Sequence, residues 1–169
     1  MNIPNVLTVI RFMIAPVFGY FLYNKQYEIS VVLFLLSGLT DVLDGYIARR
    51  FNMVTSWGKL ADPAADKLMQ LIALILLTIQ GKIPPVILII ILAKESFMGM
   101  GSILLLKKEN VVVQANWYGK ATTVVFHLAI IMIIFDVPYN NIFIFIAVIA
   151  AIYSFLRYSF AYRRIRVKN

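Results

Sequence analysis

Cysteine is absent from the 169-residue sequence, histidine occurs once, and Asp and Glu together number only eight. The lack of cysteine excludes disulfide bonds and thiolate metal sites. Internal repeats and low-complexity tracts are also missing, and no polar segment is long enough to form a separate soluble domain. We therefore expect a single domain over residues 1–169, whose chemistry depends on a small number of charged side chains.

Apolar residues are abundant instead: 62% of the chain is hydrophobic, and the mean hydropathy is +0.85. Ordinary soluble domains are roughly 45–50% apolar. Six apolar stretches each approach the ~20 residues with which a helix crosses a bilayer. They predict an all-α integral membrane bundle of six transmembrane helices over residues 3–23, 28–50, 58–80, 83–107, 117–135 and 139–161.

The first apolar stretch does not have the pattern of a secretory signal peptide. Arg11 and Pro16 interrupt it, and no small-residue cleavage site follows a basic start. We therefore expect this stretch to be the first helix of the bundle.

The net charge of +8 is distributed unevenly over the predicted loops. Lys and Arg gather at the second-to-third link, at the fourth-to-fifth link and in the C-terminal tail, whereas the other loops hold little more than Lys25 and Lys82. An excess of Lys and Arg marks the cytoplasmic side of a membrane protein. We expect both termini to be cytoplasmic and the basic side to meet anionic lipid, with no role for nucleic acid.

Four of the acidic residues lie in apolar helices at matched spacing. Asp41 and Asp44 are near the end of the second predicted helix, and Asp62 and Asp66 are near the start of the third. Residues three or four apart share one face of a helix. Because a short link joins these helices as antiparallel neighbours, the two pairs can face each other near the cytoplasmic side.

Carboxylates packed this closely repel one another unless protons or a cation neutralise them. Oxygen ligands without cysteine or a nearby histidine favour a hard ion such as Mg²⁺, Mn²⁺ or Ca²⁺. The alternatives are helix-end aspartates solvated by water, or the ion pathway of a divalent-cation transporter.

Small residues next to the aspartates distinguish these alternatives. Gly45, Ala48 and Gly58 leave room for a ligand to approach the backbone, although small residues also serve helix packing in membranes. Arg49 lies at the mouth of this groove and can pair with a phosphate. Together with the carboxylates, these residues indicate a metal-bound phosphate ester and argue against the transporter.

The same residues resemble the signature of the CDP-alcohol phosphotransferase (CDP-alcohol phosphatidyltransferase) family, DxxDGxxAR followed by GxxxDxxxD. Every motif position is present with unbroken spacing from Asp41 to Asp66. The six-span layout is also similar to that family, so the resemblance covers nearly the whole chain. It implies an enzyme that transfers a phosphatidyl group from CDP-diacylglycerol to an alcohol and releases CMP.

The resemblance also implies residue roles, two Mg²⁺ or Mn²⁺ ions and a homodimer in the membrane. Asp41, Asp44 and Asp62 would bind metal, and Asp66 would share the second ion and act as the base for the acceptor hydroxyl. The residues implied for binding the cytidine diphosphate are Asn5, Thr8, Gly45, Ala48, Arg49 and Gly58. For Asn5 and Thr8, in the opening IPNVLTVIR, a helix cap is the alternative role.

The opening segment and the loop lengths resemble the branch with glycerol-bearing acceptors. Glycerol 3-phosphate, the acceptor of phosphatidylglycerophosphate synthases, is expected first, and phosphatidylglycerol, the acceptor of cardiolipin synthases, is the alternative. The candidate cations for the acceptor are Lys94, Lys120 and Arg157. Thr122 and Ser102 stand where phosphatidylglycerophosphate synthases carry cations, which favours the alternative.

Overall fold

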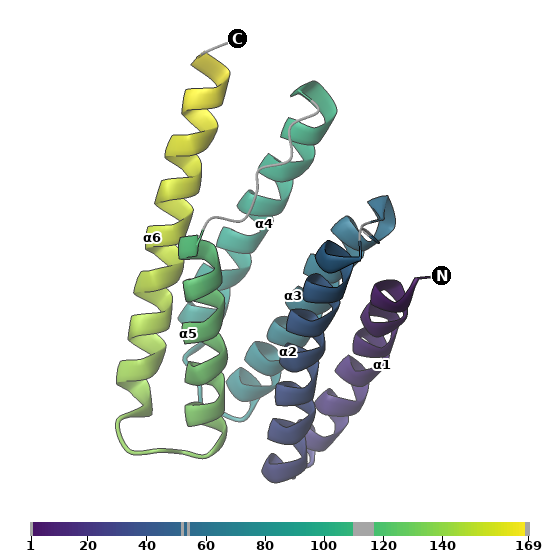
Figure 1. The fold of residues 1–169 in the computed structure, drawn as a ribbon. Helices are drawn as coiled ribbons and strands as arrows, with labels where there is room; N and C mark the ends of the chain where they lie inside the picture. The colour runs from purple at the N-terminus through teal and green to yellow at the C-terminus, as the bar shows by residue number, and fades with distance from the viewer. Residues whose placement is uncertain (1, 52, 54, 110–116, 168–169) are drawn as a thin grey trace. The chain divides into compact units, whose positions relative to one another are not determined.

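The computed structural model describes residues 2–51, 53, 55–109 and 117–167. The described part is helical throughout, with no strand, and this confirms the predicted all-α class (Figure 1). Each predicted helix is present within a few residues of its expected bounds, except that the last continues to Val167. The helices are α1 (Ile3–Tyr23), α2 (Tyr27–Arg50), α3 (Ser56–Ile79), α4 (Pro85–Glu109), α5 (Trp117–Ile134) and α6 (Asn140–Val167).

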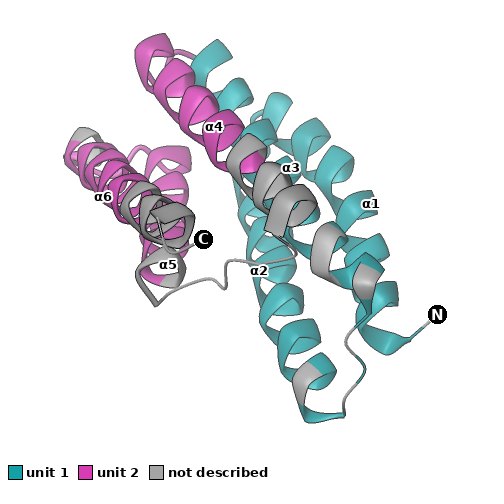
Figure 2. Ribbon diagram, turned by 90° about the horizontal axis from the view of Figure 1, so that it is seen from above, with its two compact units in different colours: residues 1–80 teal, residues 81–169 magenta. Residues whose placement is uncertain are grey.

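The helices form two compact units, residues 1–80 (unit 1) and residues 81–169 (unit 2), coloured separately in Figure 2. Unit 1 contains α1–α3 and unit 2 contains α4–α6. The single domain over residues 1–169 stays a prediction.

In unit 1, α1 packs against both α2 and α3, whereas α2 and α3 contact each other over a smaller region. The rings of Phe18 on α1 and Phe34 on α2 stack with centroids 5.4 Å apart. On the other side of α1, a Cβ atom added at Gly19 would lie 3.0 Å from Cγ2 of Ile72, so glycine allows α1 to approach α3 closely. The second and third helices are thus neighbours, as predicted, but α1 makes the larger interfaces with both.

Both ends of α3 are fixed by polar contacts. At its start, the Thr55 hydroxyl accepts a 3.0 Å hydrogen bond from the backbone N–H of Gly58, which caps an otherwise unpaired donor. At its end, the Gln80 amide donates a 2.7 Å hydrogen bond to the backbone carbonyl of Leu22 on α1. The second contact joins the end of α3 to the end of α1.

In unit 2, α4 and α5 pack against α6 around a core of branched aliphatic residues such as Ile91, Ile130 and Ile144. Lys82 precedes α4 and binds the end of α5, donating hydrogen bonds to the carbonyl of Ile134 at 2.8 Å and to Asp136 Oδ2 at 2.6 Å. A cation at this position satisfies a carbonyl that the end of α5 leaves unpaired.

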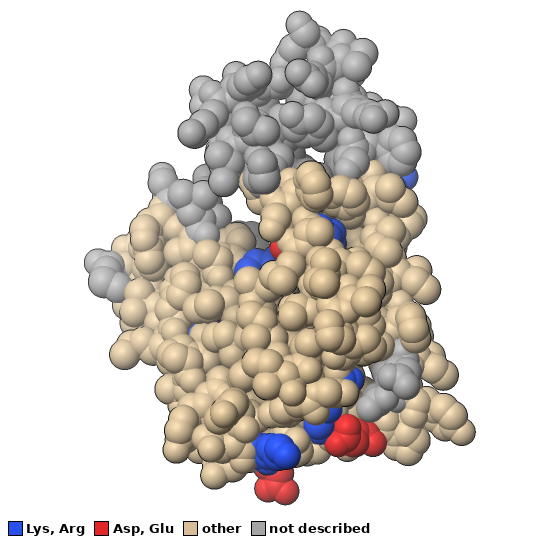
Figure 3. Space-filling view, turned by 180° about the vertical axis from the view of Figure 1, so that it is seen from behind, with Lys and Arg blue, Asp and Glu red and all other residues tan. Residues whose placement is uncertain are grey.

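Many large apolar side chains point outward, and most of the described atoms on the face shown in Figure 3 are uncharged. On α1 the exposed side chains of Val6, Ile10, Met13, Val17 and Tyr20 recur every three or four residues, which gives an apolar stripe that is unusual on a water-soluble helix. In the part of the chain that the structure describes, two helices, over Ile3–Tyr23 and Tyr27–Ala48, are long and apolar enough to cross a membrane. Shorter apolar segments occur at Ala121–Ile134 and Ile142–Arg157.

Candidate active site

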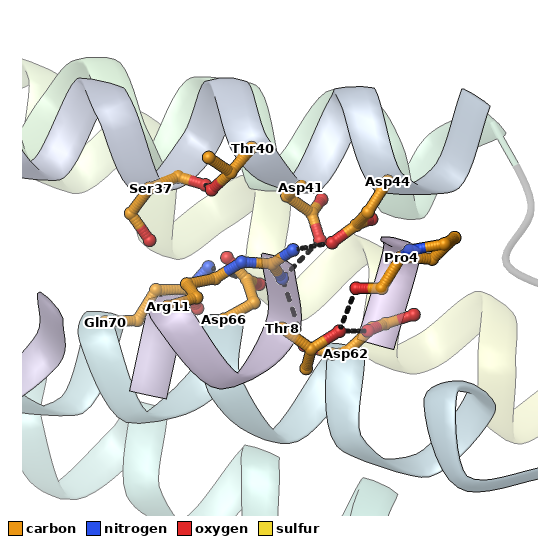
Figure 4. A network of polar contacts seen from close by, with 10 residues as sticks. All are labelled: Pro4, Thr8, Arg11, Ser37, Thr40, Asp41, Asp44, Asp62, Asp66 and Gln70. Atoms are coloured by element: carbon orange, nitrogen blue, oxygen red, sulfur yellow. Dashed lines mark hydrogen bonds and ion pairs between the residues drawn. The ribbon is translucent and has the colours of Figure 1, made fainter. Parts of the chain in front are cut away.

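Buried polar side chains concentrate in unit 1. Among the side chains that the structure describes, all the buried polar and charged ones belong to α1, α2 or α3. Buried polar groups are costly unless they are paired, so such a cluster is more informative than exposed charge. The buried residues are Thr8, Arg11, Ser30, Ser37, Asp44 and Gln70. All except Ser30 lie in the polar cluster drawn in Figure 4, which also contains Asp41, Asp62 and Asp66.

Arg11 is the centre of this cluster. Its side chain is 1% exposed, and its Nη1 lies 2.6 Å from Asp41 Oδ1 while its Nη2 contacts Asp44 Oδ2 (Figure 4). Nη1 also lies 3.4 Å from the backbone carbonyl of Asp62 on α3. One guanidinium from α1 therefore connects two carboxylates of α2 with the backbone of α3.

Thr8 lies one turn before Arg11 and contacts the carboxylate of Asp62. Its hydroxyl donates to Asp62 Oδ1 and lies 3.1 Å from the backbone carbonyl of Pro4. The side chain of Thr8 is fully buried and that of Asp62 is partly buried, so this contact is partly shielded from solvent. The structure thus brings Thr8 to Asp62, and binding of cytidine diphosphate by Thr8 stays a prediction.

Asp66 is held on α3 by a neighbour one turn later. The Gln70 amide donates a 3.0 Å hydrogen bond to Asp66 Oδ2, and Lys67 Nζ donates a 3.2 Å hydrogen bond to Gln70 Oε1. Gln70 is 6% exposed. The orientation of the predicted base therefore depends on a buried side chain.

Asn5, Thr55 and Gly58 form a second contact between α1 and the start of α3. The Thr55 hydroxyl donates a 3.0 Å hydrogen bond to Asn5 Oδ1. A Cβ atom at Gly58 would lie 3.2 Å from Asn5 Oδ1 and 3.1 Å from Thr55 Oγ1, so only glycine leaves this space free. Asn5 and Gly58, predicted separately for cytidine diphosphate binding, are therefore adjacent, and Asp62 Oδ2 lies 3.7 Å from the same added atom.

Of the other residues predicted to bind cytidine diphosphate, Gly45 and Ala48 follow Asp44 on α2 and are half-buried. The side chain of Arg49 lies outside the described residues. The nucleotide role of all three positions stays a prediction.

The predicted acceptor-binding cations all belong to unit 2. Lys94 Nζ lies 2.6 Å from Glu95 Oε1, and Arg157 is exposed on α6. The side chains of Lys120 and Ser102 lie outside the described residues, whereas the Thr122 hydroxyl lies 3.4 Å from the Ala150 carbonyl. Acceptor binding by these cations stays a prediction.

The donor chemistry of the cluster in unit 1 fits a divalent cation. Carboxylate oxygens are ligands that Mg²⁺ and Mn²⁺ prefer, and three of the aspartates direct oxygen atoms toward the same segment of α1. In this structure the guanidinium of Arg11 is the cation between Asp41 and Asp44. Within the described part of the chain, no three His, Cys, Asp or Glu side chains converge into a metal-binding group.

The model of the CDP-alcohol phosphatidyltransferase family matches residues 1–153. The chain belongs to this family. The match includes all of unit 1 and therefore every residue of the cluster around Arg11.

Three similar proteins carry one or other of two names. A CDP-diacylglycerol–glycerol-3-phosphate 3-phosphatidyltransferase of Aquifex aeolicus is 31% identical over 169 residues, covering 94% of each chain. The protein of the same name in Bacillus subtilis is 34% identical over 137 residues, covering 72% of this chain and 70% of its own. A cardiolipin synthase (CMP-forming) of Homo sapiens is 38% identical over 95 residues, covering 56% of this chain and 32% of its own.

Sequence reasoning did not assign Arg11, Gln70 or Thr55 to the site. Arg11 carried a signal, because an arginine within an apolar helix is expected to pair with buried acidic groups. Gln70 and Thr55 carried none, since neither stands at a position of the family motif and their partners are set by helix packing.

Proposed function

We propose that this chain transfers a phosphatidyl group from CDP-diacylglycerol to glycerol 3-phosphate and releases CMP. The observation that carries the proposal is the polar cluster of unit 1, in which Asp41, Asp44 and Asp62 converge on α1 inside a chain matched by the family model. The names of the relatives from Aquifex aeolicus and Bacillus subtilis support the choice of acceptor.

In the proposed reaction the acceptor oxygen attacks the phosphorus that carries diacylglycerol. Asp66 removes the hydroxyl proton as the new phosphorus–oxygen bond forms. The bond from this phosphorus to the oxygen of CMP breaks, and CMP leaves with that oxygen. Gln70 supports the step by fixing Oδ2 of Asp66 with its amide.

Asp41, Asp44, Asp62 and Asp66 are the residues that would hold divalent metal, Mg²⁺ or Mn²⁺. Such an ion, when bound, offsets negative charge on the diphosphate. Asn5, Thr8, Gly45, Ala48, Arg49 and Gly58 would lie along the cytidine diphosphate. The contact of Asn5 with Thr55 beside Gly58 supports this placement, since it brings Asn5 and Gly58 together next to Asp62.

We further propose that all six helices span the membrane, with both termini and the site on the cytoplasmic side. The exposed apolar side chains of both units support the first part. The positive charges at the second-to-third link and in the C-terminal tail support the second. A homodimer is part of the same proposal.

CMP release by the purified protein in detergent tests the function. With CDP-diacylglycerol and Mn²⁺, added glycerol 3-phosphate is expected to stimulate CMP release, and EDTA is expected to abolish it. Release that is unaffected by EDTA would contradict metal dependence. Absence of release, together with Mn²⁺ uptake into proteoliposomes, would favour the divalent-cation transporter instead.

Cardiolipin synthesis is the second candidate. Thr122 and Ser102 replace cations that phosphatidylglycerophosphate synthases carry, and the human relative is named a cardiolipin synthase. Adding phosphatidylglycerol in place of glycerol 3-phosphate separates the two candidates. Stimulation by phosphatidylglycerol alone would assign the chain to cardiolipin synthesis.

A further inference from the structure

Arg11 is a buried charge to which the reaction proposed above assigns no role. It comes from α1, outside the aspartate motif, and its side chain is 1% exposed. An isolated buried guanidinium would be costly, and this one is compensated by the two carboxylates of α2. Arg11 in turn compensates the buried charge of Asp44, whose side chain is 2% exposed and whose Oδ2 contacts Nη2 of Arg11.

The shape of the guanidinium suits this position. Nη1 contacts Asp41 and Nη2 contacts Asp44, so each terminal nitrogen serves a different carboxylate. A planar fork with several donors can do this, whereas a lysine ammonium provides a single point charge. Oδ1 of Asp62 instead accepts a hydrogen bond from the neutral hydroxyl of Thr8. Arg11 contacts only the backbone carbonyl of Asp62. Nε of Arg11 has no hydrogen-bond partner, so the pairing uses the terminal nitrogens.

We propose that Arg11 is the resident counter-cation of the acidic cluster. As a positioning residue, it holds Asp41 and Asp44 in place when no metal is bound. It also competes with a divalent cation for the same carboxylate oxygens, so that the affinity for metal is lower than four aspartates alone would give. The second statement rests on the proposed function, and the first does not.

The first statement is tested in EDTA by a double-mutant cycle on the full chain in detergent. Arg11→Met is expected to lower the melting temperature by roughly 10 °C, because it leaves the buried carboxylate of Asp44 and the half-exposed one of Asp41 without their counter-charge. Adding Asp44→Asn to that variant is expected to recover part of the loss, since one of the unpaired charges is removed. Arg50→Met, which removes an exposed arginine that contacts only Tyr46 of its own helix among the described residues, is the control for net charge.

Strictly additive losses in Arg11→Met and Asp44→Asn would overturn the proposal, because they would mean that Arg11 only fills space. If Arg11→Met does not fold in EDTA, Arg11→Lys provides the same test. Lysine keeps the positive charge but cannot contact both carboxylates. The interaction free energy between position 11 and Asp44 is therefore expected to be smaller with lysine than with arginine, but still measurable.

The second statement is tested by titrating Mn²⁺ and measuring free Mn²⁺ by electron paramagnetic resonance. Arg11→Met is expected to bind Mn²⁺ about tenfold more tightly than wild type, because a unit positive charge a few ångström from the ion is removed. Arg11→Lys is expected to stay near the wild-type affinity. Unchanged or weaker Mn²⁺ binding by Arg11→Met would overturn competition.

The two proposals fail in different ways. If wild-type protein neither binds Mn²⁺ nor releases CMP, the proposed function is wrong, yet the cycle in EDTA still decides whether Arg11 is the counter-cation. If wild-type protein binds Mn²⁺ and turns over while the cycle is additive, only the role of Arg11 is wrong.

Discussion

Gln70 lies one helical turn after Asp66 on α3, and its side-chain amide donates a 3.0 Å hydrogen bond to Asp66 Oδ2. The donor is buried and is itself bound by Lys67 at 3.2 Å, so its amide orientation is fixed. A carboxylate with one oxygen held in this way presents the other in a defined direction. The proposed base therefore depends on a residue outside the family motif.

Asp66→Asn is expected to lower turnover by about 10²–10⁴-fold, because asparagine cannot accept the acceptor's proton. Binding of CDP-diacylglycerol is expected to remain, since the other motif positions are intact. CMP release gives the turnover, and thermal shift with CDP-diacylglycerol gives the binding. Asp136→Asn is the matched control, because Asp136 pairs with Lys82 in unit 2 and should leave turnover unchanged. Full activity of Asp66→Asn would remove this residue as the base.

Gln70→Met keeps the volume of the side chain and removes the amide. We expect kcat to fall about tenfold, the effect of losing one hydrogen bond to a charged group. The KM for CDP-diacylglycerol should change little, because Gln70 contacts the base and not a predicted nucleotide residue. Steady-state CMP release checks both constants. A raised KM with unchanged kcat would place Gln70 in substrate binding instead.

Thr8→Val replaces the hydroxyl with a methyl group of similar size. It leaves Asp62 Oδ1 without its donor in a partly buried site, and we expect a loss of about 1.5–3 kcal/mol in the free energy of unfolding. Thr8→Ser keeps the hydroxyl and should retain most of that stability. Urea or thermal unfolding in detergent compares the two. A loss in Thr8→Ser with none in Thr8→Val would show that the methyl group of Thr8, and not its hydroxyl, matters.

Gly58→Ala places a Cβ atom 3.1 Å from Thr55 Oγ1 and 3.2 Å from Asn5 Oδ1. Because both oxygens must move, we expect a KM for CDP-diacylglycerol raised by about tenfold, equivalent to roughly 1.4 kcal/mol of lost binding. Gly99→Ala is the control, since among the described residues nothing beyond its chain neighbours and the nearby backbone of its own helix lies within 4 Å of the Cβ added there. Similar KM values for the two variants would exclude Gly58 from the nucleotide site.

The sequence by itself determined the helices, their number and the family. Apolar stretches of the right length predict helices regardless of their neighbours, and the motif from Asp41 to Asp66 depends only on spacing within one helix pair. The bounds of α1 and α2 were predicted to within one residue for this reason. Hydropathy alone does not predict where α1 packs relative to α2 and α3.

The tertiary structure decided which groups the aspartates contact. Packing α1 against both α2 and α3 brings Arg11 to Asp41 and Asp44, across about thirty residues of sequence, and Thr8 to Asp62. Helical periodicity fixes which residues share a face, but the axial register between helices is set by side-chain packing such as that of Gly19 against Ile72. The sequence therefore determined which carboxylates form the cluster, and only the packing of three helices decided that a buried arginine lies between two of them.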